Sequence, residues 1–441
     1  MNAFNRRLSL EEAAAIIQSA KTSGLLRGAS SAIFHHLGLM RDRIAELRAS
    51  FPKNSLHTVA IKANPVVEIL REIVKMDVGL EAASIEEVAL AIVAGCPAER
   101  IVFDSPAKTV SEIRQALEWG VHLNANSFDE LERVAAAQKL LKSSSCVGLR
   151  VNTAVGRGAI KLTSVAAANS QFGVSLQSDL HKIILAFKNH RWLTGLHTHV
   201  GSQGYHLELL VEAVARIAAL RREIRGQVEK RVSYVDIGGG MPTSYRNGDV
   251  APTPGEYRAL LQQRSPDLFV DDVCLITEFG RAIHANCGIA ASRVEYVRPS
   301  QQLAFIHLGA DFLLRPVYQP DNWQHELFVV DGQGVPKLGS PRPITVVGPL
   351  CFAGDIISSE VMLPPIEAGD WILIRDVGAY TLSIWSRHCS RAIPVVLGYE
   401  PGRHDSLRVL REAETIDDIT RFWSSQRRPS ESKGISSIIR T

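Results

Sequence analysis

The chain has 441 residues, of which 46% are hydrophobic, and its 49 basic and 46 acidic side chains leave a formal net charge of +3. This length predicts more than one domain, or one large barrel with an addition. Charges this evenly balanced create no strong field of one sign, so nucleic acid is not expected as a partner.

The cysteines and the apolar segments restrict the setting of the protein. Its six cysteines are far apart and none belongs to a C-x-x-C motif, which argues against a zinc site and a disulfide framework and fits a reducing compartment. Residues 1–10 lack the apolar core of a signal peptide, and no apolar segment reaches the roughly 18 residues of a membrane span. We therefore expect a cytoplasmic protein without a membrane partner.

Short apolar segments typical of strands alternate with amphipathic segments between about residues 30 and 290. This alternation predicts βα units with parallel strands, and about eight units in this length match a closed (β/α)8 TIM-like barrel. An open doubly wound sheet is the structural alternative. The strands are expected at 31–34, 57–61, 79–82, 101–103, 122–125, 146–151, 194–199, 234–237 and 273–278.

β-type segments separated by Pro and Gly turns replace the helical pattern after about residue 290. We expect an antiparallel β-domain over 291–423, with a contribution from 1–29, beside a barrel over 30–290. Residues 424–441 are polar and turn-rich, and we expect a mobile tail. The β-domain strands are expected at 292–297, 303–307, 326–330, 343–347, 371–375 and 392–396.

Lys62 directly follows a predicted strand, in the segment Val59-Ala60-Ile61-Lys62-Ala63-Asn64. Burial lowers the pKa of a lysine and makes its amine a nucleophile, as a Schiff-base lysine requires. A single lysine at a strand end more often reaches water. Lys62 therefore indicates a Schiff base only in combination with the motifs that end later strands.

The segment from His197 to Gln203 ends one such strand. His197 and His199 lie on one face of the strand and could bind a metal, although no third ligand is evident. They could equally be two core histidines. In a third interpretation, His199 lies flat against a cofactor ring while Ser202 holds a phosphate.

Two further motifs end the next strands. The glycines of Asp236-Ile-Gly-Gly-Gly could form an anion-binding nest or a bare turn, and no Gly-Lys-Ser/Thr follows them to make a nucleotide loop. Thr277-Glu-Phe-Gly-Arg281 offers an arginine fork suited to phosphate, or a surface turn. In the expected β-domain, Cys351 and Tyr380 would separately read as an inert thiol and a packing residue.

Together, these motifs resemble the barrel-type, alanine-racemase-fold (fold type III) family of pyridoxal-phosphate-dependent decarboxylases, nearest its diaminopimelate decarboxylase branch. The resemblance extends from about residue 31 to 391. It implies a barrel with a C-terminal β-domain, pyridoxal 5'-phosphate as cofactor, an amino acid as substrate, no metal, and a homodimer with shared active sites.

The resemblance also implies a role for each motif residue. Lys62 would form the Schiff base, His199 would stack on the pyridine ring, and Glu278 would face the ring nitrogen, where a carboxylate keeps the proton that carbanion chemistry needs. Arg150 would lie near the phenolic oxygen, and Cys351 would reach the site from the partner subunit as an acid. The cofactor phosphate would be held by Ser202, Gly238, Gly239, Gly240, Gly280, Arg281 and Tyr380.

The chain departs from this family where relatives recognise the far end of the substrate. Phe352 stands where relatives carry an acid that binds a distal ammonium group. Arg315 and Tyr318 resemble the pair that binds a distal carboxylate. Glu81 keeps an acid with a longer reach at the end of its strand, and Phe279 replaces a proline.

The departures predict altered specificity for the distal group, as for a modified amino acid of secondary or siderophore metabolism. Three alternatives are a genuine meso-diaminopimelate decarboxylase of lysine biosynthesis, an amino-acid racemase, and a non-catalytic pyridoxal-phosphate-binding protein. Racemases of this fold carry an arginine in place of Glu278, which favours decarboxylation.

Overall fold

The computed structural model describes residues 2–160, 163–167, 169–229, 231–270, 272–402 and 406–425. The chain divides into two compact units. Among described residues, the barrel unit comprises 43–243 and 251–283, and the β unit comprises 2–42, 244–250 and 284–425. No helix of the described residues is long and apolar enough to cross a membrane.

The barrel unit contains eight parallel strands that close on themselves, because β5 pairs with β6 and β10 pairs with β2. A closed parallel barrel is thus confirmed, and the open sheet is excluded. A ninth short strand, β7 (Val174–Ser175), pairs with β6 alone. The barrel strands are β2 (Leu56–Ala60), β3 (Gly79–Ala82), β4 (Ile101–Asp104), β5 (His122–Ala125), β6 (Val147–Asn152), β8 (Leu193–His197), β9 (Tyr234–Asp236) and β10 (Cys274–Glu278).

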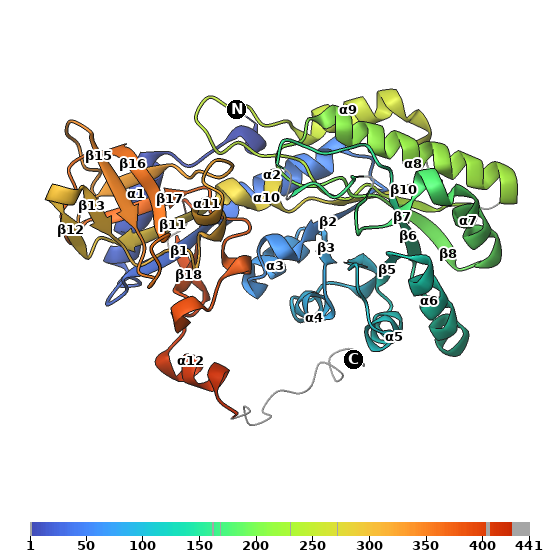
Figure 1. Ribbon diagram of the computed structural model, residues 1–441, viewed down its shortest axis with the longest axis horizontal. Helices are drawn as coiled ribbons and strands as arrows, with labels where there is room; N and C mark the ends of the chain where they lie inside the picture. Colours follow the sequence, from blue (N-terminus) through green and yellow to red (C-terminus); the bar gives the residue numbers. More distant parts are fainter. Residues whose placement is uncertain are drawn as a thin grey trace. The chain divides into compact units, whose positions relative to one another are not determined.

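Helices follow the barrel strands and lie around them (Figure 1). Their starts are encoded locally, since side chains such as Ser84, Thr109, Ser127 and Thr253 accept a hydrogen bond from the third backbone N–H of the helix. The helices are α3 (Val67–Val74), α4 (Ile85–Val93), α5 (Val110–Trp119), α6 (Phe128–Leu141), α7 (Leu176–Asn189), α8 (Leu207–Val228) and α9 (Pro254–Arg264), while α2 (Leu37–Ser50) and α10 (Arg281–His284) cross the unit boundaries.

The β unit contains two sheets. The first has the order β14 (Leu327–Val330), β17 (Trp371–Arg375), β11 (Gly288–Arg293), β1 (Ser31–His36), β18 (Val395–Tyr399) and β19 (Leu407–Arg411). The second has the order β12 (Tyr296–Arg298), β13 (Leu303–Phe305), β15 (Arg342–Val347) and β16 (Ile356–Leu363). Pairing is antiparallel except between β1 and β18 and between β13 and β15.

Strand β1 differs from the sequence-based interpretation, which counted residues 31–34 among the barrel strands. It pairs with β11 and β18 of the β unit instead. Its apolar run cannot reveal this, because a buried strand reads the same in either sheet. The expected mobile tail falls largely on 426–441, outside the described residues.

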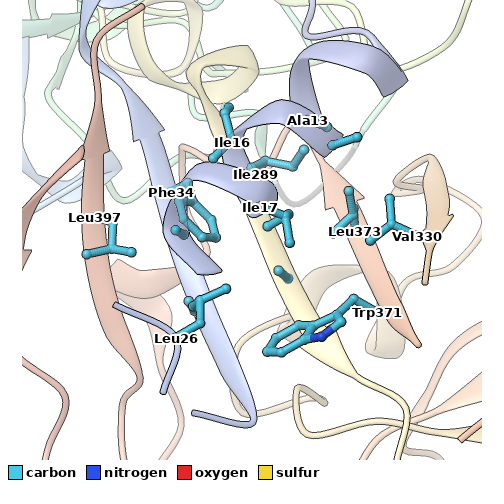
Figure 2. Close-up of a cluster of buried hydrophobic side chains, with 14 of the residues drawn as sticks. Ala13, Ile16, Ile17, Leu26, Phe34, Ile289, Val330, Trp371, Leu373 and Leu397 are labelled. Atoms are coloured by element: carbon cyan, nitrogen blue, oxygen red, sulfur yellow. The ribbon is translucent and has the colours of Figure 1, made fainter. Parts of the chain in front are cut away.

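Helix α1 (Leu10–Thr22) covers one face of the six-stranded sheet (Figure 2). A capping box between Ser9 and Glu12 starts the helix. Its buried residues Ala13, Ile16, Ile17 and Ala20 recur at helical spacing and pack against apolar side chains of the sheet. Those sheet residues include Phe34, Ile289, Leu373 and Leu397.

The remaining helices of the β unit are short: α11 (Leu314–Tyr318) and α12 (Ile416–Trp423). Single 3₁₀ turns occur in both units, at Ala3–Asn5, Ile61–Ala63, Ala98–Arg100, Pro266–Leu268, Ala285–Cys287, Pro299–Gln301, Leu382–Ile384 and His388–Ser390.

Candidate active site

The carboxyl ends of the barrel strands carry the chemically active side chains of the barrel unit. Lys62 lies in the 3₁₀ turn after β2, His199 follows β8, the glycines 238–240 follow β9, and Glu278 ends β10. Parallel strands of a closed barrel place all these ends at one rim, where barrel enzymes have their active sites.

Lys62 is bound by a buried acid. Its Nζ lies 2.6 and 2.7 Å from the two carboxylate oxygens of Glu81 at the end of β3. Burial raises the pKa of Glu81, and the charge of Lys62 opposes that rise only in part. The Lys62 side chain is 37% exposed, so it is less enclosed than its place after an apolar strand suggested.

Three buried side chains meet around the end of β10. Potential ligand atoms of His197, Asp236 and Glu278 all lie within 4.8 Å of one another. Burial, with the carboxyl of Asp236 nearby, raises the pKa of Glu278 well above its ordinary value, and burial raises the pKa of Asp236 to about 7. Glu278 Oε1 has no hydrogen-bond partner among the described residues, so this carboxyl suits a ligand that shares a proton with it.

The two histidines of the β8 end are neutral at pH 7. Burial lowers the pKa of His197 to about 3 and that of His199 well below its ordinary value. The Nδ1 atom of His199 accepts the backbone N–H of Gly239 at 3.0 Å, which fixes the ring beside the glycine turn. An uncharged, oriented imidazole is suited to packing against a flat ring.

Arg150 of β6 forms a buried ion pair with Asp104 of β4, with NH1 2.5 Å from Oδ2. Burial alone would raise the pKa of Asp104, but Arg150 together with His197, Lys108 and Lys62 outweighs burial and holds that pKa well below its usual range. The guanidinium carbon of Arg150 also lies 4.6 Å from the centre of the Phe172 ring. Arg150 is therefore a fixed cation inside the barrel.

Two of the three backbone N–H groups of the glycine turn are already bonded within the protein. The N–H of Gly238 donates to Asp236 Oδ1 at 3.0 Å, and the N–H of Gly239 goes to His199. A side chain on Gly240 would come within 2.5 Å of the Gly201 carbonyl oxygen, so these glycines mainly permit close backbone packing.

A guanidinium and a hydroxyl, which a phosphate site would need, lie together after the strands that carry these turns. The Nε atom of Arg281 lies 3.1 Å from Ser202 Oγ, which places a guanidinium and a hydroxyl together. A Cβ on Gly280 would come within 2.8 Å of the Ala63 side chain, so Gly280 lets this segment approach the Lys62 turn. An amine, a phosphate-binding pair and a buried carboxyl are the donor set that pyridoxal phosphate requires.

The predicted site residues of the β unit take part in two separate sets of aromatic contacts within that unit. The Arg315 guanidinium carbon lies 4.6 Å from the Tyr380 ring centre and 4.9 Å from that of Trp323. The rings of Tyr318 and Phe352 stack with centres 5.7 Å apart and planes 10° apart. Cys351 is exposed.

Asp355 lies four residues after Cys351 and is the alternative acid for binding a distal ammonium group. It is 4% exposed, and its two carboxylate oxygens accept the backbone N–H groups of Ala310 and Leu350, each at 2.7 Å. A carboxylate with both oxygens bound to backbone is a structural anchor. Only its three-dimensional surroundings reveal this, whereas Asp236 could have been noticed as an acid at a strand end.

The sequence of the chain is similar to those of known proteins. A family model described as the pyridoxal-binding domain of pyridoxal-dependent decarboxylases matches residues 37–285. Diaminopimelate decarboxylase of Campylobacter jejuni is 28% identical over 391 residues, which cover 87% of this chain and 93% of that protein. Its counterpart from Helicobacter pylori is 30% identical over 377 residues, 84% of this chain and 89% of that protein.

Solved structures agree. The crystal structure of Helicobacter pylori diaminopimelate decarboxylase complexed with L-lysine matches 91% of this chain and 98% of its own, with a TM-score of 0.82 and 27% identity. Fold and site together define a barrel-type, pyridoxal-phosphate-dependent enzyme. The chain belongs to the family of pyridoxal-dependent decarboxylases and is an amino-acid decarboxylase. The resemblance noted from the motifs is confirmed, as are the fold class and the cofactor.

Proposed function

We propose that this enzyme decarboxylates an amino acid whose far end carries a carboxylate or an acylated amine rather than a free ammonium group. The observation that carries the proposal is that neither Phe352 nor Asp355 offers a free carboxylate to an ammonium group. Phe352 stacks on Tyr318, and both oxygens of Asp355 are bound to backbone. An ammonium group brought out of water without an acidic partner costs several kcal/mol.

Arg315 supports the other half of the proposal. It keeps a fixed positive charge against Tyr380 and Trp323, and a guanidinium can bind a carboxylate through two parallel hydrogen bonds. The aromatic pair of Tyr318 and Phe352 would lie along an acyl or alkyl chain. Such a substrate fits the modified amino acids of secondary or siderophore metabolism.

The barrel residues would hold the cofactor and its protons. Pyridoxal phosphate, when bound, supplies the electron sink that makes loss of carbon dioxide from Cα possible. Lys62 would hold it covalently through the amine, and His199 would lie against its ring. Glu278 would keep a proton at the ring nitrogen, and Arg150 would place a positive charge near the phenolic oxygen.

The phosphate would be bound chiefly by Arg281 and Ser202, with Tyr380 as a further donor. Gly238, Gly239, Gly240 and Gly280 would allow the backbone to come close to it. These contacts are equal in the ground and transition states, so they would anchor the cofactor rather than accelerate the reaction.

Cys351 would return a proton to Cα, from the partner subunit of a homodimer. The thiol is exposed in the single chain, as a residue that acts in a neighbouring subunit must be. Two-fold dimers are the commonest assemblies of identical chains, and each would contain two shared sites.

The test is a panel of amino acids scored for release of carbon dioxide and, in parallel, for racemisation. The panel contains diaminopimelate, lysine, ornithine and acyl- or citryl-conjugated diamino acids. We expect the conjugated or anionic compounds to be turned over best and the three free amines weakly, with no racemisation. Phe352→Glu should shift preference toward diaminopimelate, whereas the control Phe352→Leu, which removes the ring without adding charge, should not.

The names of the relatives support a second candidate, diaminopimelate itself. Efficient turnover of diaminopimelate by the wild type, with kcat/KM above about 10⁴ M⁻¹s⁻¹, would decide for that candidate. Racemisation without release of carbon dioxide would contradict both.

A further inference from the structure

The turn that follows strand β17 has an unusual backbone. Asp376 and Tyr380 adopt positive φ angles of 64° and 57°, a left-handed conformation that residues other than glycine rarely take. Between them, Gly378 packs so closely on the His284 carbonyl that no side chain could be added there. A turn of this kind persists only where surrounding contacts hold it in place.

Asp376 provides much of that hold. Its side chain is fully buried and accepts a hydrogen bond from Asn286 Nδ2 at 2.7 Å. It also accepts two hydrogen bonds from Arg7, one of them from Nε at 3.0 Å. Arg7 lies in the N-terminal segment, 369 residues before Asp376 in the sequence. The N-terminal segment therefore stabilises the turn.

Arg7 is itself held by the same unit of the protein. It donates to the carbonyl oxygen of Tyr245 at 2.8 Å and to Asn247 Oδ1 at 3.1 Å. The neighbouring Arg375 binds the carbonyl oxygen of Leu8 at 3.0 Å. The side chain of Arg7 is only 10% exposed. A guanidinium with this many directed partners has a single orientation, which a lysine cannot reproduce.

The same turn ends in a residue of the proposed site. The ring centre of Tyr380 lies 4.6 Å from the Arg315 guanidinium carbon, and that of Trp323 lies 4.9 Å from the same atom. Arg7 is therefore linked to Arg315 by its hydrogen bonds to Asp376, by the backbone of the turn from Asp376 to Tyr380, and by the contact of Tyr380 with Arg315. These last two are the residues proposed to bind the cofactor phosphate and the distal carboxylate of the substrate.

We propose that Arg7 is a positioning residue for both of these functions, so that the N-terminal segment sets the placement of Tyr380 and Arg315. The inference rests on the proposed roles of Tyr380 and Arg315. A purely structural residue would affect only folding. A positioning residue also affects cofactor affinity and substrate KM in the folded enzyme.

Arg6 provides a matched control. It neighbours Arg7 in the sequence, has the same side chain, and pairs with Glu12 at 2.7 Å in a half-exposed position. Full-length Arg7→Gln and Arg6→Gln enzymes are depleted of cofactor and titrated with pyridoxal phosphate by fluorescence. Reloaded enzymes are then assayed for KM and kcat on the best substrate of the panel, and unfolding midpoints are recorded.

We expect Arg7→Gln to raise the dissociation constant of pyridoxal phosphate and the KM about tenfold or more, with a smaller change in kcat. Arg6→Gln should stay within about twofold of wild type, and Arg7→Lys should be intermediate. If Arg7→Gln does not fold, Arg7→Lys carries the test. A lowered unfolding midpoint with cofactor affinity and KM unchanged would overturn the inference, as would equal effects of Arg6→Gln and Arg7→Gln.

Tyr380→Ala distinguishes the positioning role of Arg7 from the phosphate-binding role of Tyr380. If it weakens binding of pyridoxal phosphate while Arg7→Gln does not, the positioning role alone is wrong. If Tyr380→Ala itself leaves cofactor affinity unchanged, the proposed phosphate role of Tyr380 fails, and the inference fails with it. In the double variant, the two changes should combine to less than the product of their separate effects, since both act through one ring.

Discussion

Asp355 offers a direct test of how the substrate end of the site is built. The change Asp355→Asn keeps the shape of the side chain and one oxygen, and replaces the other oxygen with an NH₂ group. One of the two backbone N–H groups that it now serves, at Ala310 and Leu350, must then face a donor. The site is closed around the carboxylate, since a Cβ at Gly309 would come within 2.5 Å of it.

The magnitude follows from these contacts. A hydrogen bond to a charged group contributes about 1.5–3 kcal/mol, and a buried donor without a partner costs about 1–3 kcal/mol more. We therefore expect Asp355→Asn to lower the free energy of unfolding by about 2.5–6 kcal/mol. Asp331 is the control, because it accepts the N–H groups of Gln333 and Val335 at 2.8 and 2.9 Å in an exposed turn. Water can replace these bonds, so Asp331→Asn should cost far less.

The assay is urea unfolding of the cofactor-depleted variants, followed by tryptophan fluorescence, together with steady-state kinetics below the unfolding transition. The folded fraction of Asp355→Asn should keep the substrate preference of the wild type. The reasoning is refuted if the variant is nearly as stable as wild type yet selectively loses activity on diaminopimelate or lysine. That result would mean that Asp355 binds the distal ammonium group of the substrate.

Three further outcomes are expected. Glu278→Gln should still bind pyridoxal phosphate but decarboxylate roughly 10²-fold more slowly or worse, and near-normal turnover would assign the proton to another group. The pKa of Asp236 is raised in the folded protein to about 7, so its contribution to the stability of the cofactor-free protein is complete below pH 4 and is lost as the pH rises through 7. Asp236→Asn should therefore gain stability relative to wild type between pH 4 and 8, by up to about 4 kcal/mol, and parallel unfolding curves against pH would contradict this. Mixing inactive Lys62→Ala and Cys351→Ala chains should restore up to about a quarter of wild-type activity if active sites are shared, whereas no recovery after proven subunit exchange would exclude shared sites.

The sequence by itself determined the class of the protein. Alternating strand and helix patterns are local, and in a closed parallel barrel every strand ends at the same rim. The motifs around Lys62, His199, Glu278 and Arg281 could therefore be assigned to one end of the barrel without coordinates. The replacement by Phe352 was equally visible, because it is a change of residue type within a recognised motif.

Only the tertiary structure decided which side chains lie in contact and which hydrogen-bonding groups are already bonded within the protein. The pairing of Lys62 with Glu81 and the buried group around Asp236 join strands that are far apart in the sequence. Their pKa shifts come from burial and from neighbours across the barrel, which no local pattern encodes. For the same reason, the sequence could not show that β1 joins the sheet of the β unit, or that the N–H groups of two glycines are already used within the protein.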